Sequence, residues 1–250
     1  MRAVVTHTPT NAEFFEVLAS GHHGYPQPQD DYRKVYEDVC PRCGIHGRQI
    51  HPFRLKESGL APHSAFLQLN WVFDAFFVQR QVAAALASAG TGGISFGPVL
   101  DHRNGSEIND RVQLLIPTIV ACAETTRLFA MTCRPDNEEM IKLRARFPDW
   151  KSATDSANYP PETYCGRVKH HPPTSVGITA PVDVDLPDLF QTEEWFGSGA
   201  GAFRLTLASE RFVEIVQQHS WRGIEFRRAE QGGLSERTCD PRPTGPPKSA

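Results

Sequence analysis

Two short cysteine-glycine motifs carry the residue types and spacing in this chain that could do chemistry. The first, "CPRCG", is an intact Cys-x-x-Cys-Gly knuckle, a tight turn that directs the thiolates of Cys40 and Cys43 toward one cation. Its glycine allows the left-handed backbone conformation that such a turn needs. The second motif, within "YPPETYCGR", keeps Cys165 and its glycine but has Glu162 where the first cysteine would stand. The two motifs predict one metal site shared by distant segments.

A structural zinc ion is the metal that this pattern favours, because it takes four ligands in a tetrahedron and readily accepts thiolates. Cys40, Cys43 and Cys165 supply three of them. The candidates for the fourth ligand, in order of preference, are Glu162, then His170 or His171, then His46. A second interpretation stays open, in which the knuckle persists as a turn without metal and Cys165 is a buried thiol.

The other cysteines suggest no chemistry. Cys122 and Cys133 lie in apolar surroundings and are predicted to be inert core residues. A redox role for Cys40 and Cys43 is disfavoured, because no helix-forming sequence follows their motif as a thioredoxin-like mechanism requires. Six cysteines in 250 residues are too few for a disulfide-dense secreted scaffold, which favours a reducing cytoplasm.

Composition and missing motifs argue against several function classes. A net charge of −3 gives no broad basic surface for non-specific nucleic-acid binding. No apolar run approaches the roughly 20 residues of a membrane span, and the N-terminal stretch lacks the pattern of a secretion signal. The sequence has no nucleophile elbow, phosphate-binding loop, dinucleotide fingerprint or His-Glu-x-x-His motif, so it predicts a protein that is not an enzyme.

Hydrophobic patterning predicts the elements that must position the cysteines. The run "SAFLQLNWVFDAFFVQRQVAAALASAG" begins as a strand and becomes a helix, with apolar residues on one face from Val78 to Ala89. Further on, "FRLTL" is predicted as a strand, "SERFVEIVQQHS" as a helix capped by Ser209, and "GIEFR" as a strand. The apolar middle is divided by Pro117 into two strands, "NEEMIKLRARF" is a predicted helix, and "ITAPVDVDLPDLFQTEEWFGSGAGAF" is predicted to be turn-rich.

The two halves of the chain are weakly similar. When Gly93 of "GISF" is placed on Gly223 of "GIEF", the apolar positions of the two preceding helices also coincide. This predicts an α+β fold of two loosely similar lobes, each running knuckle, strand, helix, strand, and joined at a zinc-ribbon-like cysteine site. The predicted boundaries are residues 1–34 for an N-terminal element and polar loop, 35–147 for the first lobe, 148–228 for the second lobe with the degenerate knuckle, and 229–250 for a disordered tail.

Several of these motifs together resemble the myxobacterial double-CxxCG motif family. They are "CPRCG", "GISFGPV", the second "CG" and above all "LTLASERFVEIVQQHSWRGIEFRR", within residues 35–228. That family includes immunity proteins of swapping-toxin systems, in which lipoprotein toxins pass between kin cells, and it carries cysteine at the position of Glu162. The resemblance implies a cytoplasmic, non-enzymatic immunity protein that binds one cognate toxin domain and blocks it.

Inhibition by direct contact needs a complementary surface with aromatic or arginine anchors. The predicted contact residues lie in "DVDLPDLFQTEEWF" and are Asp188, Phe190, Glu193, Glu194 and Trp195, which combine negative charge with large contact area. The alternative function is a zinc-ribbon-like nucleic-acid-binding module. That function would require basic residues near the knuckle, and the chain offers Arg42, Arg48, Arg54 and Lys56.

Overall fold

A computed structural model describes residues 13–56, 63–134, 164–179, 185–198 and 201–231 of the chain. Within these ranges the protein is a mixed α/β fold, built mostly of strands with two α-helices and one short 3-10 helix. The 3-10 helix is η1 (Tyr32–Val35). The predicted helix "NEEMIKLRARF" lies outside the described residues. Neither described α-helix is long and apolar enough to cross a membrane.

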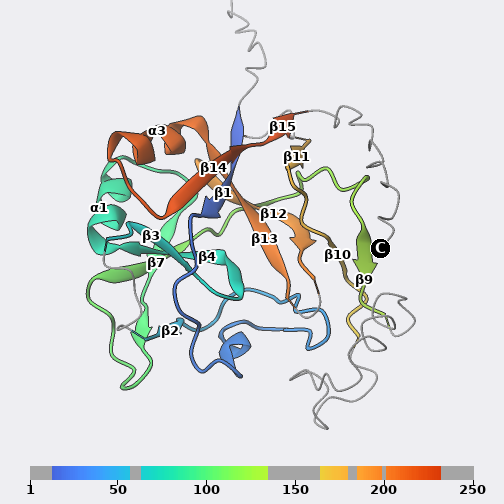
Figure 1. Cartoon of the computed structure of the whole chain (residues 1–250), viewed down its shortest axis with the longest axis horizontal. Coiled ribbons are helices and arrows are strands. Elements are labelled where there is room, and N and C mark those ends of the chain that lie inside the picture. Colours follow the sequence, from blue (N-terminus) through green and yellow to red (C-terminus); the bar gives the residue numbers. More distant parts are fainter. Residues whose placement is uncertain (1–12, 57–62, 135–163, 180–184, 199–200, 232–250) are drawn as a thin grey trace, which may run out of the picture.

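The largest sheet has seven strands and gathers segments from the whole length of the chain (Figure 1). Its order is β14-β1-β13-β12-β10-β9, with β8 also paired to β12. The strands are β1 (Phe14–Ala19), β8 (Ile119–Val120), β9 (Ala130–Thr132), β10 (Val168–His170), β12 (Leu189–Phe196), β13 (Phe203–Ser209) and β14 (Ile224–Arg228). The N-terminal element therefore lies between β13 and β14, beside residues predicted to form the second lobe.

A second sheet has four strands in the order β3-β4-β7-β5. The strands are β3 (Phe66–Leu69), β4 (Val72–Gln79), β5 (Ser95–Gly97) and β7 (Arg111–Leu115). Two small sheets complete the fold. One pairs β2 (Arg54–Leu55) with β6 (Leu100–Asp101), and the other pairs β11 (Gly177–Ile178) with β15 (Glu230–Gln231). Glu230 and Gln231, which belong to the predicted tail, thus form a strand, and residues 232–250 of that tail lie outside the described residues.

Both α-helices follow directly on a strand, as the sequence predicts. α1 (Arg80–Ser88) continues from β4, and α3 (Glu210–Gln218) continues from β13. Ser209 caps α3, since its hydroxyl accepts a hydrogen bond from the backbone N–H of Phe212 at 3.2 Å. α1 begins after Gln79, which makes no side-chain capping bond.

The four-stranded sheet and the β14-β1-β13-β12 part of the larger sheet have the same arrangement. In both, neighbouring strands are antiparallel, a helix follows an inner strand (β4 or β13), and a glycine precedes the edge strand after the helix (β5 or β14). The helices lie next to each other (Figure 1), and one hydrophobic cluster includes side chains from both. Val82 and Leu86 of α1 share this cluster with Phe212 and Val216 of α3. This cluster therefore packs the two parts of the fold against each other.

Two equivalent hydrogen bonds, each beside a glycine, connect the four-stranded sheet with the β14-β1-β13-β12 part of the larger sheet. The N–H of Leu189, at the start of β12, donates to the carbonyl of Gly92, and the N–H of Phe66, at the start of β3, donates to the carbonyl of Arg222. The next residues, Gly93 and Gly223, both have positive φ. A Cβ on Gly93 would lie 2.2 Å from the Leu189 oxygen, and one on Gly223 would lie 1.9 Å from the Phe66 oxygen. Each part thus leaves space for the backbone of the other at a residue without a side chain.

Candidate metal centre

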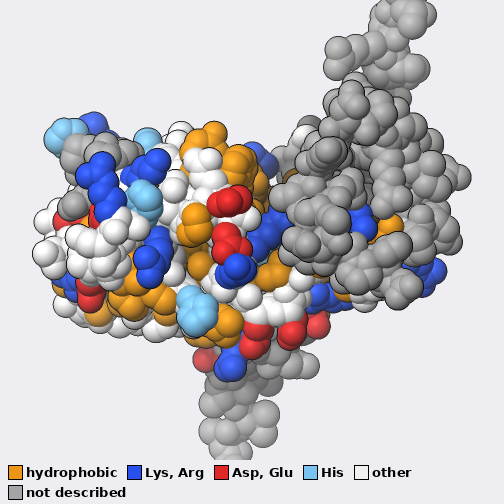
Figure 2. All heavy atoms as spheres, turned by 90° about the horizontal axis from the view of Figure 1, so that it is seen from below, with side chains coloured by type: hydrophobic (Ala, Val, Ile, Leu, Met, Phe, Trp, Pro, Cys, Tyr) orange, Lys and Arg blue, Asp and Glu red, His pale blue; other side chains and the backbone are white. Residues whose placement is uncertain are grey.

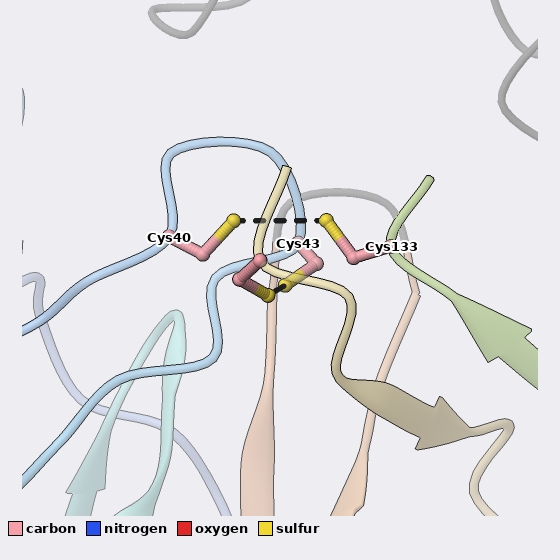
Figure 3. A group of neighbouring side chains, drawn as sticks. Cys40, Cys43 and Cys133 are labelled. Atoms are coloured by element: carbon pink, nitrogen blue, oxygen red, sulfur yellow. Dashed lines mark hydrogen bonds between the residues drawn. The ribbon is translucent and has the colours of Figure 1, made fainter. Parts of the chain in front are cut away.

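Four cysteines from three separate segments meet at one point beside the sheets. The sulfur atoms of Cys40, Cys43, Cys133 and Cys165 all lie within 4.8 Å of one another. Figure 3 shows the side chains of Cys40, Cys43 and Cys133 turned toward a common centre, with Cys133 on the segment that follows β9. Cys40, Cys43 and Cys133 are buried, and Cys165 is the most exposed of the four.

The sulfur spacing fits a tetrahedral metal. With Zn–S bonds of about 2.3 Å, two thiolates on one zinc ion lie roughly 3.8 Å apart. Cys40 and Cys133 are separated by 3.7 Å, and Cys43 and Cys165 by 3.6 Å. These distances are far longer than the roughly 2.05 Å of a disulfide, and the thiols are free. Four sulfur donors in this geometry suit a closed structural zinc site.

The first knuckle positions its two cysteines through backbone hydrogen bonds. The N–H of Gly44 donates to the carbonyl of Cys40 at 2.9 Å, and the N–H of Cys40 donates to the carbonyl of Ile45 at 2.8 Å. Gly44 has a φ of 78°, a left-handed conformation that glycine adopts without steric cost. This closed turn holds Cys40 and Cys43 on one side of the centre.

The second knuckle has the same hydrogen bonds, although its two cysteines come from different segments. The N–H of Gly166 donates to the carbonyl of Cys133 at 3.1 Å, and the N–H of Cys133 donates to the carbonyl of Arg167 at 2.9 Å. Gly166 has a φ of 69°, close to the value at Gly44. Cys133 therefore takes the place of the first cysteine that the "YCG" motif lacks. The antiparallel pairing of β9 with β10 holds these segments together.

Two cations of the β10 segment, which we define as residues 164–170, bind carbonyl groups of the first knuckle and of residues near it on either side. The guanidinium of Arg167 donates to the carbonyls of Asp38 at 3.1 Å and Ile45 at 3.0 Å. The ammonium of Lys169 donates to the carbonyl of Cys43 at 2.8 Å, and Lys169 is fully buried. It also donates to the carbonyl of Gly201 at 2.8 Å, which links the centre to the connection before β13.

The surroundings favour ionisation of one thiol in particular. A hydrogen bond from the Cys43 thiol lowers the pKa of Cys40 to about 4, and the backbone N–H groups of Cys43 and Arg42 act in the same direction, while burial opposes them. The same thiol–thiol bond, together with burial, raises the pKa of Cys43, and burial raises the pKa of Cys133 to about 11. The surroundings thus favour the thiolate form of Cys40, and a bound divalent cation would favour the thiolate form of the other three cysteines.

The structure confirms that Cys40, Cys43 and Cys165 lie together, and it corrects the role of Cys133. Cys133 was predicted to be an inert core residue, but it is the fourth member of the cluster. Glu162 lies outside the described residues, and four thiols complete a tetrahedral ligand set without it. The sequence signal for Cys133 is weak, because its partner motif begins more than 30 residues later in the chain.

The histidine candidates have other neighbours. His46 stacks on Tyr36, with ring centroids 3.7 Å apart, and its Nε2 lies 3.7 Å from a carboxylate oxygen of Asp74. Burial lowers the pKa of His46 and raises that of Asp74. His170 packs toward the ring of Phe196. His171 packs toward Phe129. The described metal-ligand cluster contains cysteines alone.

The predicted contact residues lie mainly inside the protein. Residues 189–196 of the predicted turn-rich stretch form strand β12, which is paired with β13 on one side and with β8 and β10 on the other. Phe190 and Trp195 are buried, so the prediction that these two rings lie on an exposed binding loop is wrong. The carboxylate of Asp188 accepts hydrogen bonds from Gly92 and Ser209, and that of Glu194 accepts one from the N–H of Ala123. Glu193 is exposed.

A different set of aromatic side chains forms an exposed surface group. This aromatic patch consists of the exposed Tyr25 and Trp71 and the partly buried Tyr32. The rings of Tyr25 and Trp71 are 4.6 Å apart, and Trp71 is 49% exposed at the turn between β3 and β4. Trp71 also has a φ of 70°, which is rare for a bulky residue and which the tight turn between the two strands requires.

The basic residues near the knuckle do not form one exposed cluster. Arg42 is buried with its guanidinium over the ring of Tyr164, and Arg48 pairs with Glu37 at 3.0 Å. Figure 2 shows one face of the molecule, on which basic and acidic side chains are mixed with hydrophobic ones. Two of the four cations considered for nucleic-acid binding are therefore engaged within the protein.

No family model matches this chain, and no curated protein matches it.

Proposed function

We propose that this protein is a zinc-stabilised binding protein that neutralises a cognate toxin domain by direct contact. The observation that carries the proposal is the pair of equivalent knuckles around four thiols. The resemblance to the double-CxxCG family is incomplete at Glu162, where that family has cysteine. Cys133 supplies the missing thiol and makes the same backbone hydrogen bonds as Cys40. The departure in sequence is thus compensated in space.

Zinc in this proposal is structural, and it does not react. It joins three segments that are far apart in the chain, and binding free energy at such a site stabilises the fold directly. The two lobes expected from the sequence would then be tied at this centre as well as through their common core. All four donors belong to the protein, which leaves no open coordination position for a substrate.

The zinc assignment is tested by metal analysis of the purified protein with two matched variants. Cys133→Ala removes a proposed ligand, whereas Cys122→Ala removes an equally buried thiol outside the cluster. We expect one zinc ion per chain in the wild type and in Cys122→Ala, and a large loss in Cys133→Ala. Equal zinc content in the two variants, or a wild type without zinc, would contradict the assignment.

The toxin-binding surface in this proposal is the aromatic patch. Tryptophan and tyrosine are the residues most often found as binding anchors, and Trp71 is the most exposed ring of the patch. It lies at the tip of a hairpin, and its ring packs against that of Tyr25, 4.6 Å away, so part of the side chain is ordered before binding. The patch takes over the role that the sequence assigned to Phe190 and Trp195.

Neutralisation is tested by co-expressing the protein with the product of the neighbouring upstream gene and measuring growth. Trp71→Asn removes the ring but keeps a residue that tolerates positive φ. Phe129→Asn is the matched control, because Phe129 is 58% exposed but lies next to β9. We expect the control to protect growth as the wild type does. Trp71→Asn should protect growth less, because it should bind the toxin at least about 30-fold more weakly, the loss typical of a hot spot. Full protection by Trp71→Asn would rule out this surface, and salt-dependent DNA or RNA binding without protection would favour the nucleic-acid alternative.

A further inference from the structure

One side of the β10 segment presents a thiol and two cations to the first knuckle. Arg167 and Lys169 are spaced by two residues, the period at which side chains of an extended chain share a face, and Cys165 precedes them across the turn at Gly166. Each reaches the same turn. Cys165 lies 3.6 Å from the sulfur of Cys43, Arg167 binds the carbonyl of Ile45, and Lys169 binds the carbonyl of Cys43.

A charge argument distinguishes this arrangement from ordinary packing. A divalent cation held by four thiolates has a net charge of two minus, and a buried site of that charge is costly unless cations lie near it. Lys169 is fully buried, and a buried ammonium is costly for the same reason. Each charge therefore lowers the cost of burying the other. Arg42, a cation within the first knuckle, is directed to the ring of Tyr164.

We infer that Lys169, assisted by Arg167, is a positioning residue that supplies the countercharge for a dianionic four-thiolate metal centre. The inference rests on the proposed zinc site and adds to it the residues that select the charge of the occupied centre. Lys169 also holds the carbonyl of a ligand residue, so it fixes the position of Cys43 while it offsets the charge. Outer residues that bind metal ligands commonly change metal affinity 10- to 100-fold.

The first test is zinc affinity, measured by competition with a colorimetric chelator on folded protein. Lys169→Met removes the charge and keeps an unbranched side chain only one atom shorter, and we expect a 10- to 100-fold weaker affinity. Arg111→Met is the matched control, because Arg111 is also fully buried but lies on β7 in the other sheet. We expect the control to lower stability and to leave zinc affinity within about threefold of the wild type, well below that outer-residue effect.

The second test separates charge from packing. Iron bound by four thiolates has a net charge of one minus when ferric and two minus when ferrous, so a nearby cation favours the ferrous form. In the iron-loaded protein, we expect Lys169→Met to shift the ferric/ferrous reduction potential to more negative values, while Arg111→Met leaves it unchanged. A residue that acts through packing alone would not produce this difference.

The possible outcomes decide the inference. Zinc affinity of Lys169→Met within twofold of the wild type, an equal loss in Arg111→Met, or an unchanged potential in Lys169→Met would each overturn it. If Lys169→Met does not fold with zinc present, Arg167→Gln decides, with at least a threefold loss of affinity expected and no loss overturning the inference. Absence of zinc from the wild type is a separate result, because it refutes the proposed site itself.

Discussion

The reciprocal contact at Gly223 gives the sharpest quantitative prediction. In Gly223→Ala, the new Cβ would lie 1.9 Å from the carbonyl oxygen of Phe66, and it must move to at least 3.0 Å. That shift separates the edge of β14 from β3 and weakens the hydrogen bond from the N–H of Phe66 to the carbonyl of Arg222, now 3.0 Å long. The residue also has a φ of 96°, which an alanine rarely adopts.

The expected cost follows from three contributions. Overpacking costs about 1–3 kcal/mol, the weakened hydrogen bond about 0.5–1.5 kcal/mol, and the positive φ about 1–2 kcal/mol. Together they predict a loss of roughly 3–6 kcal/mol in the free energy of unfolding, a large part of the total stability of a typical domain. Gly93→Ala should behave similarly, because its Cβ would lie 2.2 Å from the carbonyl oxygen of Leu189.

Urea denaturation monitored by circular dichroism measures this loss, with the zinc concentration held constant. Gly90→Ala is the matched control, since Gly90 has a φ of 64° but no atom within 4 Å of its Cβ position. The control should lose about 1–2 kcal/mol, which is the cost of the backbone conformation alone. If Gly223→Ala is no more than about 1 kcal/mol less stable than Gly90→Ala, the steric reasoning is refuted, because overpacking alone should exceed that difference.

Three further predictions concern the caps, a buried carboxyl group and the metal. Ser209→Ala removes the cap of α3 and should lower the free energy of unfolding, measured by urea titration, by about 1 kcal/mol. Gln79→Ser adds a cap to α1 and should raise it by up to about 1 kcal/mol. No change in either variant would contradict the capping argument. Burial raises the pKa of Glu16 although Arg227 opposes it, so the stability linked to its protonation is present at acidic pH and is lost as pH rises through the folded pKa. Glu16→Gln should therefore be more stable than the wild type at pH 7, and this difference should vanish below the ordinary glutamate pKa of about 4.3; a difference independent of pH would show that the titration is not its cause. Removing zinc with a chelator should lower the melting temperature of the wild type and not that of Cys133→Ala, and equal shifts would mean that the chelator acts elsewhere.

Local signals predicted the helices and the strands next to them. Ser209 marks the start of α3, and Gly90 follows the end of α1, each through the backbone groups of a few neighbouring residues. These interactions are contained in short stretches of sequence. They could be read without knowledge of the tertiary structure.

The strand β12 was not predicted, and its irregular register gives the reason. The pairing of β12 with β13 shifts between Gln191 and Trp195, which is the mark of a bulge. The bulge interrupts the two-residue alternation that identifies a strand, and both ends of β12 are buried. Charged residues in "TEEWF" then gave the stretch the composition of a loop.

The candidate site was predictable where its ligands share a motif. The knuckle identified Cys40 and Cys43, and the remaining "CG" identified Cys165. Cys133 has no glycine beside it, and only the pairing of β9 with β10 brings it to the centre. That pairing depends on long-range contacts, which residue types and spacing do not encode.

The discontinuous second knuckle has a consequence for the order of events during biosynthesis. Cys133 is made 93 residues after Cys40, and Cys165 is made 122 residues after Cys43. At typical translation rates of about 5–20 residues per second, the first two ligands leave the ribosome roughly 6–25 s before the last one. During that interval the nascent chain offers an incomplete chelate, and binding of a metal ion by all four thiols would have to wait until residue 165 has been synthesised.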